Sequence, residues 1–248
     1  MAKTALVTGA AAGIGRACAM RLAREGIGVG VLDVNLEGCQ AVVAEIEAAG
    51  GKAVALQASV ADRGQVTAAV AKLREALGPV TIVVNNAGIS RVVPFKDLTD
   101  EQWDEMLEIN LKGTFIVTQT VFPDMEAAQW GRIVNISSSS AQTGAVGMAH
   151  YSASKGAMIT LTRTLAQELG PLGITVNNIP PGTVMQTIMS EAMRKSAPDR
   201  VEEIGKAIPV QRFGEPADIA NACAWLVSED SGYVTGQTIG VNGGRVVS

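Results

Sequence analysis

Short apolar runs alternate with longer segments whose apolar residues recur at helical spacing. A brief apolar run that ends at a turn signal is typical of a buried strand, and a 3.6-residue period is typical of a helix packed on a sheet. The predicted strands cover residues 3–8, 29–33, 53–56, 81–84, 131–136, 174–179 and 237–241. The predicted helices cover residues 13–26, 36–49, 65–77, a segment capped by Thr99, 114–125, 152–170 and 217–227. This order predicts an α/β fold, a doubly wound parallel sheet of about seven strands flanked by helices.

No stretch of the chain has the composition of a linker, a repeat or a low-complexity segment. With 248 residues, 47% of them hydrophobic, the chain contains enough apolar material for one large core. We therefore expect residues 1–248 to form a single domain. Residues of about 183–209 combine Met189 and Met193 with polar neighbours, which suits an adaptable lid over a ligand, although core packing explains them equally well.

The charge and the cysteines narrow the class of protein. A net charge of −4 offers no basic footprint for nucleic acid, and the longest apolar runs fall far short of a membrane span. Because residue 3 already enters a strand, we expect no signal peptide and a cytoplasmic protein. Cys18, Cys39 and Cys223 are far apart and the chain has 1 histidine, so no metal site is predicted.

Tyr151 and Lys155 bring a phenol and an ammonium together. They are four residues apart at the start of a predicted helix, so their side chains share one face. A phenol has a pKa near 10, and lowering it by about 3 units requires about 4 kcal/mol. One positive charge at about 4 Å supplies roughly that energy at an effective dielectric near 20, but only about 1 kcal/mol in bulk water. The pair can therefore do acid–base work only in a partly dry site, and by itself the pattern also suits two polar residues on a helix face.

A glycine-rich turn separates the first predicted strand from the first predicted helix. Gly9, Gly13 and Gly15 let the backbone approach a pyrophosphate, and the helix N-terminus offers unpaired N–H groups. Asp33 ends the next strand about 20 residues later, where a carboxylate accepts hydrogen bonds from an adenosine ribose. A 2′-phosphate there would face a like charge. The pattern predicts a Rossmann-like site for NAD; the structural alternatives are a plain turn and an Asp33 that caps the following helix.

Further motifs follow in order along the chain: residues 8–15, 85–88, Asn110, Ser138, Tyr151, Lys155, 233–237 and 241–244. Together they resemble the short-chain dehydrogenase/reductase family, in its 3-oxoacyl-reductase-like branch, over nearly the whole chain. The resemblance implies four catalytic residues, namely Asn110, Ser138, Tyr151 and Lys155. Ser138, thirteen positions before Tyr151, would bind the substrate oxygen. Asn110 would help hold a water that connects Lys155 to solvent.

The resemblance also implies the cofactor contacts, which are Gly9, Ala12, Gly13, Ile14, Gly15, Asp33, Val34, Ser59, Val60, Asn86, Ala87, Gly88, Tyr151, Lys155, Pro181, Gly182, Val184 and Thr187. NADP-preferring relatives usually carry a cation beside the second glycine or after the second strand. This chain has Ala12 and the run 34–36 there, which again favours NAD. Ser59 departs from the family's usual aspartate, and either Gln186 or Thr187 would reach the nicotinamide carboxamide.

We therefore predict an oxidoreductase that transfers a hydride between NAD(H) and a secondary alcohol or ketone. The predicted substrate contacts suggest an apolar or hydroxyacyl-type substrate; they are Val93, Gln142, Met148 and Met189. An NADPH-dependent 3-oxoacyl-carrier-protein reductase is the alternative, although such relatives usually carry basic residues that the stretches 127–130 and 170–173 lack. A non-catalytic NAD(H)-binding regulator is a second alternative, but relatives of that type tend to lose the tyrosine or the lysine.

Two further features concern packing rather than chemistry. His150 adjoins Tyr151 but points about 100° away around the helix, so a satisfied structural or interface role is favoured over substrate contact. Small residues along the helix at 152–170 would let a second subunit approach closely. Family members commonly assemble through this helix and the one before it, so we expect a homotetramer or a homodimer.

Overall fold

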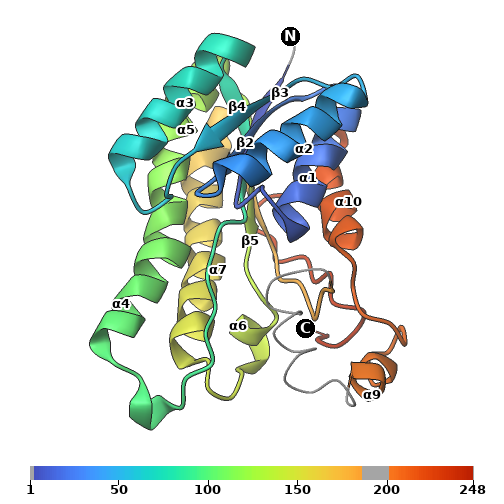
Figure 1. The fold of residues 1–248 in the computed structure, drawn as a ribbon. Helices are drawn as coiled ribbons and strands as arrows, with labels where there is room; N and C mark the ends of the chain where they lie inside the picture. The colour runs from blue at the N-terminus through green and yellow to red at the C-terminus, as the bar shows by residue number, and fades with distance from the viewer. Residues whose placement is uncertain (1–2, 186–200, 248) are drawn as a thin grey trace.

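The computed structural model describes residues 3–185 and 201–247. At its centre lies a six-stranded parallel sheet in the order β3-β2-β1-β4-β5-β6 (Figure 1). The strands are β1 Thr4–Thr8, β2 Gly28–Asp33, β3 Ala53–Gln57, β4 Val80–Asn85, β5 Gly131–Ile136 and β6 Ile174–Ile179. The expected doubly wound sheet is confirmed, because the strand order reverses between β1 and β4.

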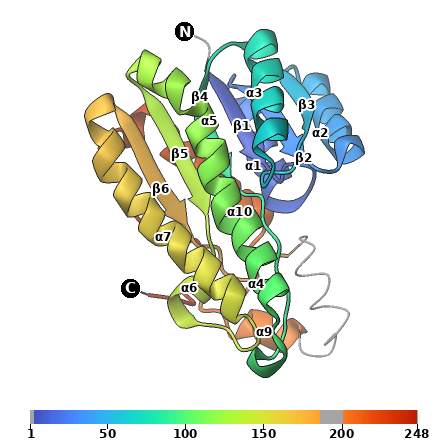
Figure 2. The ribbon, with the colours of Figure 1, turned by 90° about the vertical axis from the view of Figure 1, so that its left-hand side faces the viewer.

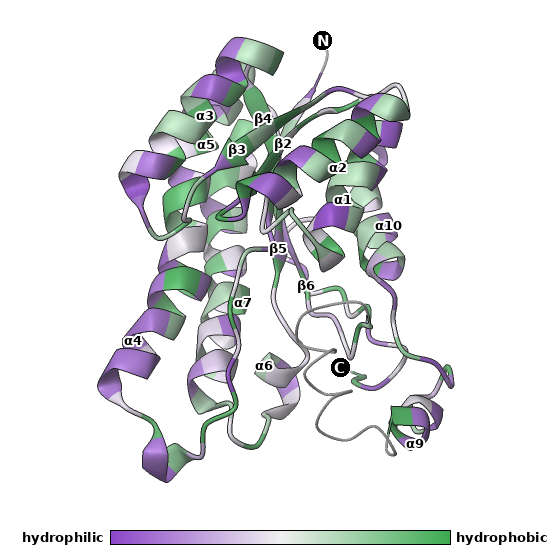
Figure 3. Ribbon diagram, in the orientation of Figure 1, coloured by the Kyte–Doolittle hydropathy of each residue, from purple (hydrophilic) through white to green (hydrophobic). Residues whose placement is uncertain are grey.

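Helices cover both faces of the sheet (Figures 1 and 2). One face carries α1 Gly13–Arg24, α2 Leu36–Ala48 and α10 Pro216–Leu226, and the other carries α3 Arg63–Leu77, α5 Gly113–Ala128 and α7 Ala149–Leu169. Successive strand residues point to opposite faces. Ala5 and Val7 of β1 therefore join the core under α1 and α10, whereas Leu6 joins the core under α3 and α5. Figure 3 shows the apolar strands at the centre and hydrophilic positions along the outer helices.

The seventh strand expected over residues 237–241 is not formed; two isolated parallel bridges join this segment to β6 and to the turn after it. Backbone bonds at this edge, such as Asn178 N–H to Gln237 O at 2.9 Å and Ile239 N–H to Asn178 O at 2.8 Å, are interspersed with bonds to side chains. Gln237 donates its backbone N–H to Asn177 Oδ1 at 3.1 Å, and Thr235 Oγ1 accepts the N–H of Val176 at 3.0 Å. The segment therefore follows the edge of β6 without becoming a regular strand.

Side-chain caps fix where several helices begin. Asp62 caps α3, and Thr99 forms a capping box with Gln102 at the start of α4 Asp100–Leu107, as the sequence indicates. The cap of α2 is Asn35 and not Asp33, which contradicts the structural alternative for Asp33. The carboxylate of Asp33 is therefore available for other partners.

α4 and α5 are joined by a π-helical turn, Glu108–Lys112, with Asn110 at its centre. Asn110 thus lies at an irregular turn between the two helices, and its side chain is completely buried. π-helical turns occur frequently at functional sites, because the extra residue in the turn redirects a side chain.

The expected lid at 183–209 falls largely outside the described residues, as do Gln186, Thr187 and Met189. Its second part includes the short helix α9 Val201–Lys206. Within residues 3–185 and 201–247, no helix is both long enough and apolar enough to cross a bilayer. The same ranges hold no group of three or more side chains suited to a metal ion.

Candidate active site

The carboxyl ends of the strands bring the predicted site residues to one edge of the sheet. β1 leads into Gly9, β2 ends at Asp33, and β4 leads into Asn86. β5 leads into Ser138, and β6 leads into Pro181. In an open parallel sheet the ligand crevice lies outside these ends, where the strand order reverses. Here that place is between β1 and β4, with the glycine-rich turn on one side and Ser138 on the other.

The glycine-rich turn can hold an anion. Gly9 and Gly13 have φ angles of 62° and 53°, which side chains with a Cβ rarely adopt. A Cβ on Gly15 would lie 2.1 Å from the carbonyl oxygen of Gly9, so the helix and the turn touch backbone to backbone. α1 begins after Ala12 with no side-chain cap and no acidic residue in its first turn. Its N–H groups remain available for a phosphate.

Asn86 ties this turn to β4. Its amide nitrogen donates to the carbonyl oxygens of Thr8 and Gly9, each at 3.0 Å. Thr8 Oγ1 in turn accepts the backbone N–H groups of Asn86 and Ala87 at 3.1 and 3.0 Å. The motif that begins at Asn85 thus has a structural role in addition to its place along the crevice.

Both carboxylate oxygens of Asp33 are hydrogen-bonded to backbone. Oδ2 accepts the N–H of Ala11 at 3.3 Å, and Oδ1 accepts the N–H of Asn35 at 3.1 Å. The carboxylate is therefore held beside the glycine-rich turn. Burial, together with the charge of Asp33, raises the pKa of Cys39 to about 11, so this thiol stays protonated and inert.

Ser59 follows β3 at the same edge. Its hydroxyl accepts the N–H of Ala61 at 3.3 Å, and its own N–H donates to Gln65 Oε1 at 2.9 Å. The serine that departs from the family pattern is thus engaged within its own loop, and Val60 beside it is buried.

Tyr151, Ser138 and Lys155 meet at the start of α7. Ser138 acts on the phenol of Tyr151, because its side chain lowers the pKa of that group. Ser138 Oγ accepts both the N–H and the hydroxyl of Ser140, at 3.2 and 2.9 Å, so its own hydrogen can be donated. Lys155 Nζ lies 6.0 Å from the centre of the Tyr151 ring and donates to the carbonyl oxygen of Ile136 at 2.9 Å.

Burial dominates the ionisation of both groups. It raises the pKa of Tyr151 above its usual 10, and the hydrogen bond with Ser138 opposes that rise. Burial also lowers the pKa of Lys155 to about 8. At neutral pH the phenol is therefore protonated, which is the form that can donate a proton, while the ammonium is charged. The partly dry site that the pair requires is present, since Tyr151 and Lys155 are only 6% and 4% exposed.

Asn110 lies behind this pair. Its Oδ1 accepts the N–H of Ile89 at 2.8 Å, and its Nδ2 lies 3.0 Å from the carbonyl oxygen of Ile89 and 3.1 Å from Ser154 Oγ. A Cβ on Gly88 would lie 2.9 Å from Asn110 Oδ1 and 3.3 Å from Lys155 Nζ, so these groups surround the same glycine. The structure thus brings Asn110, Ser138, Tyr151 and Lys155 into one region.

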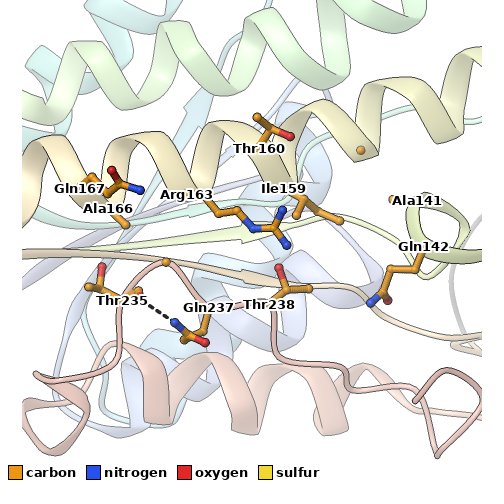
Figure 4. A pocket seen from close by; sticks show the side chains of 12 residues that line it. Ala141, Gln142, Ile159, Thr160, Arg163, Ala166, Gln167, Thr235, Gln237 and Thr238 are labelled. Atoms are coloured by element: carbon orange, nitrogen blue, oxygen red, sulfur yellow. Dashed lines mark hydrogen bonds between the residues drawn. The ribbon is translucent and has the colours of Figure 1, made fainter. Parts of the chain in front are cut away.

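The predicted substrate contacts are only partly brought together. Val93 donates its N–H to the carbonyl oxygen of Gly147 at 2.8 Å, which places the loop after β4 beside Met148. Gln142, in α6 Ser140–Thr143, instead lines a hollow of about 800 Å³ between α7 and residues 235–238 (Figure 4). In Figure 4 it points into that hollow together with Arg163 of α7.

His150 is fully buried, and neither ring nitrogen has a hydrogen-bond partner among the described residues. Burial, with the nearby charge of Arg91, lowers the pKa of the imidazole. A satisfied structural role within this part of one chain is therefore contradicted, whereas the interface role stays a prediction.

Sequence reasoning missed two residues at this site, Ser154 and Ile89. Both act through contacts with Asn110, at separations of 44 and 21 residues. Little in the sequence identifies Ser154 as a site residue, because it is recognisable only as a hydroxyl residue directly before Lys155.

The chain is similar to known proteins over its whole length. The profile of the family described as "short chain dehydrogenase" matches residues 3–198. The 3-oxoacyl-[acyl-carrier-protein] reductase FabG of Staphylococcus aureus (strain Mu50) is 42% identical over 245 residues, 98% of each chain. The short-chain reductase protein NovJ of Streptomyces niveus is 42% identical over 97% of this chain and 93% of its own. A solved structure of a tryptophan variant of actinorhodin polyketide ketoreductase with NADPH matches with a TM-score of 0.94 at 36% identity, over 98% of this chain and 97% of the other. A buried tyrosine–lysine pair at the carboxyl edge of a doubly wound sheet, joined to sequence similarity of this extent, leads to one conclusion: the chain belongs to the short-chain dehydrogenase family.

Proposed function

We propose that this protein reduces the ketone of a 3-oxoacyl-type substrate, and in reverse oxidises the corresponding secondary alcohol. The observation that carries the proposal is the buried phenol of Tyr151, whose pKa responds to Ser138 and whose ring has the ammonium of Lys155 beside it. The names of the relatives, which describe a 3-oxoacyl reductase and a polyketide ketoreductase, support ketone reduction, the reaction of the alternative considered from the sequence.

In the reduction, Tyr151 donates its proton to the carbonyl oxygen of the substrate as charge develops there. Ser138 donates a hydrogen bond to the same oxygen and holds it beside the phenol. Lys155 stabilises the phenolate that remains, because its ammonium lies beside the Tyr151 ring in a buried site where opposite charges are weakly screened. A bound nicotinamide supplies the hydride. In the oxidation, Tyr151 accepts the proton instead.

We propose NAD(H) as the cofactor. The uncapped N-terminus of α1 suits the pyrophosphate, and the backbone-held carboxylate of Asp33 suits the two ribose hydroxyls. No basic side chain occupies position 12 or positions 34–36 to neutralise a 2′-phosphate. The other proposed contacts in the described ranges follow the same edge and are Gly9, Ala12, Gly13, Ile14, Gly15, Val34, Ser59, Val60, Asn86, Ala87, Gly88, Pro181, Gly182 and Val184.

We expect kcat/KM for NADH to exceed that for NADPH by at least about tenfold, because a 2′-phosphate would lie against the half-buried carboxylate of Asp33 and repel it at short range. Asp33→Asn removes the charge and should reduce or reverse the preference for NADH over NADPH. The exposed Asp230→Asn, in the short turn Glu229–Ser231, is the matched control and should leave the ratio unchanged. Steady-state kinetics with both cofactors measure it, and a wild-type preference for NADPH would contradict the NAD assignment.

The test of the reaction itself is NAD(P)H absorbance with a panel of 3-oxoacyl thioesters and simple ketones. Thioesters of carrier protein, coenzyme A and N-acetylcysteamine separate recognition of the carrier from recognition of the acyl group. We expect turnover with at least one 3-oxoacyl thioester. Cofactor binding without turnover of any ketone or alcohol would instead favour the non-catalytic regulator.

We also propose that the protein forms a homotetramer or homodimer through α5 and α7. Phe115 of α5 is 44% exposed, with the guanidinium of Arg63 5.4 Å from its ring centre, and so offers an aromatic and an arginine side chain of the kind enriched at interfaces. Light scattering with size-exclusion chromatography measures the mass, and a monomer at micromolar concentration would contradict the proposed assembly.

A cytoplasmic location is proposed as well, since the three cysteines are free and buried.

A further inference from the structure

The first turn of α7 carries Tyr151 but lacks the usual means of holding a helix end. α7 begins at Ala149, so Tyr151 is its third residue. The N-cap residue, Met148, makes no side-chain cap hydrogen bond, and the first turn contains no acidic residue. Side-chain caps stabilise helix starts by about 1 kcal/mol, and uncapped ends tend to fray. Contacts other than a helix cap must therefore fix the position of the Tyr151 phenol.

Ser154 makes contacts that can do this. It is fully buried, and its hydroxyl donates to the carbonyl oxygen of Tyr151 at 2.8 Å. The same oxygen atom, Ser154 Oγ, accepts from Asn110 Nδ2 at 3.1 Å. One hydroxyl therefore joins the first turn of α7 to the π-helical turn at Asn110.

The partner of Ser154 is itself held rigidly. The N–H of Ile89 donates to Asn110 Oδ1 at 2.8 Å, which fixes the orientation of the amide and directs Nδ2 away from that N–H. Nδ2 also contacts the carbonyl oxygen of Ile89 at 3.0 Å and the sulfur of Met106 at 3.1 Å. A buried amide with this many partners has little freedom, so it is a suitable anchor for α7.

We propose that Ser154 is a positioning residue for the reaction described above: it anchors the uncapped start of α7 to Asn110 and so keeps Tyr151 and Lys155 aligned. The inference rests on the proposed function of Tyr151. Ser154 touches neither the phenol nor the ammonium by any hydrogen bond in the described ranges, and it acts through the backbone that carries them.

An ordinary structural serine is the competing explanation. Buried serines often donate to a carbonyl oxygen three or four residues earlier in a helix, with no role beyond satisfying the hydroxyl. Such a serine would affect folding stability alone. A positioning serine would affect the chemical step and the environment of the phenol even where the protein remains fully folded.

The chain offers a matched control on the same helix. Ser152 lies two residues earlier, and its buried Oγ has no hydrogen-bond partner within residues 3–185 and 201–247. Ser154→Ala should lower kcat by about tenfold or more, with KM for the cofactor nearly unchanged, whereas Ser152→Ala should leave kcat unchanged. Ser154→Cys keeps the side-chain size but is a poor hydrogen-bonding group, so it should resemble Ser154→Ala.

A second measurement needs no turnover. The protein has 2 tyrosines, and Tyr233 is fully exposed, so in a Tyr233→Phe background phenolate absorbance reports Tyr151 alone. Burial holds the pKa of Tyr151 above 10. If loss of the Ser154 anchor loosens the first turn, water reaches the phenol and its pKa should fall toward 10. Ser152→Ala should leave the titration midpoint in place.

The proposal is overturned if Ser154→Ala keeps both the kcat and the phenol titration of the parent, or if Ser152→Ala changes them equally. It is also overturned if Ser154→Ala lowers only the melting temperature. Inactivity of the parent protein on every ketone would refute the proposed function, while the titration would still decide whether Ser154 anchors the phenol.

Discussion

Tyr151→Phe should lower kcat by about 10²- to 10⁴-fold, the range that a positioned general acid–base contributes. The substitution removes one hydroxyl from a ring that is 6% exposed, so the fold should survive. Ser138 and Lys155 would still surround the ketone, but neither is placed to deliver the proton that the phenol donates. Cofactor binding should change little. Steady-state kinetics and NADH fluorescence titration measure the two effects separately.

Tyr233→Phe is the matched control, because Tyr233 is fully exposed and lies outside the site. We expect it to behave like the parent protein in both measurements. Near-parental turnover by Tyr151→Phe would show that another group supplies the proton, and the mechanism proposed for this site would then be wrong.

Lys155→Met should abolish most of the activity and at the same time stabilise the protein at neutral pH. The pKa of Lys155 is lowered by burial from 10.5 to about 8. The unfolded chain therefore holds this proton more tightly than the folded protein does, so the charged ammonium opposes folding below about pH 8. A shift of this size corresponds to roughly 3 kcal/mol. Part of that gain is offset when the methionine leaves the carbonyl oxygen of Ile136 unpaired, so we expect a net gain of about 1–2 kcal/mol.

The free energy of unfolding should depend on pH in a direction that the lowered pKa of Lys155 determines. As pH rises from about 8 to 10.5, the stability penalty of the ammonium is relieved, so the parent protein should gain stability relative to Lys155→Met over this window. Urea unfolding at pH 7 and at pH 10 measures the difference. Lys206→Met, at an exposed lysine paired with Glu202, should show neither effect. A Lys155→Met protein less stable than the parent at pH 7 would contradict the account.

The regular part of the fold and the core of the site were predictable because their signals are local. Six of the strands are brief apolar runs, and all of them except the edge strand β3 are largely buried on both faces of the sheet. The pairing of Tyr151 with Lys155 follows from helical spacing, and the caps at Asp62 and Thr99 follow from side chains three residues from their partners.

The features that were not predicted depend on contacts between distant segments. Residues 237–241 have the composition of a strand, but the Asn177 side chain takes the N–H of Gln237 and the Thr235 side chain takes the N–H of Val176, so the backbone ladder with β6 is interrupted. Gln142 follows Ser138 closely in sequence, yet α6 turns it into the hollow beside Arg163. The anchoring of Asn110 joins three segments of the chain, and no periodicity in any one of them indicates it.

The bonds from Asn86 to the glycine-rich turn have a thermodynamic consequence. The carbonyl oxygens of Thr8 and Gly9 are held at 3.0 Å by the amide nitrogen of Asn86 within the protein itself. This glycine-rich segment therefore loses its conformational entropy when the protein folds, and not when it binds a dinucleotide. A preorganised receptor of this kind retains more of its contact energy as affinity.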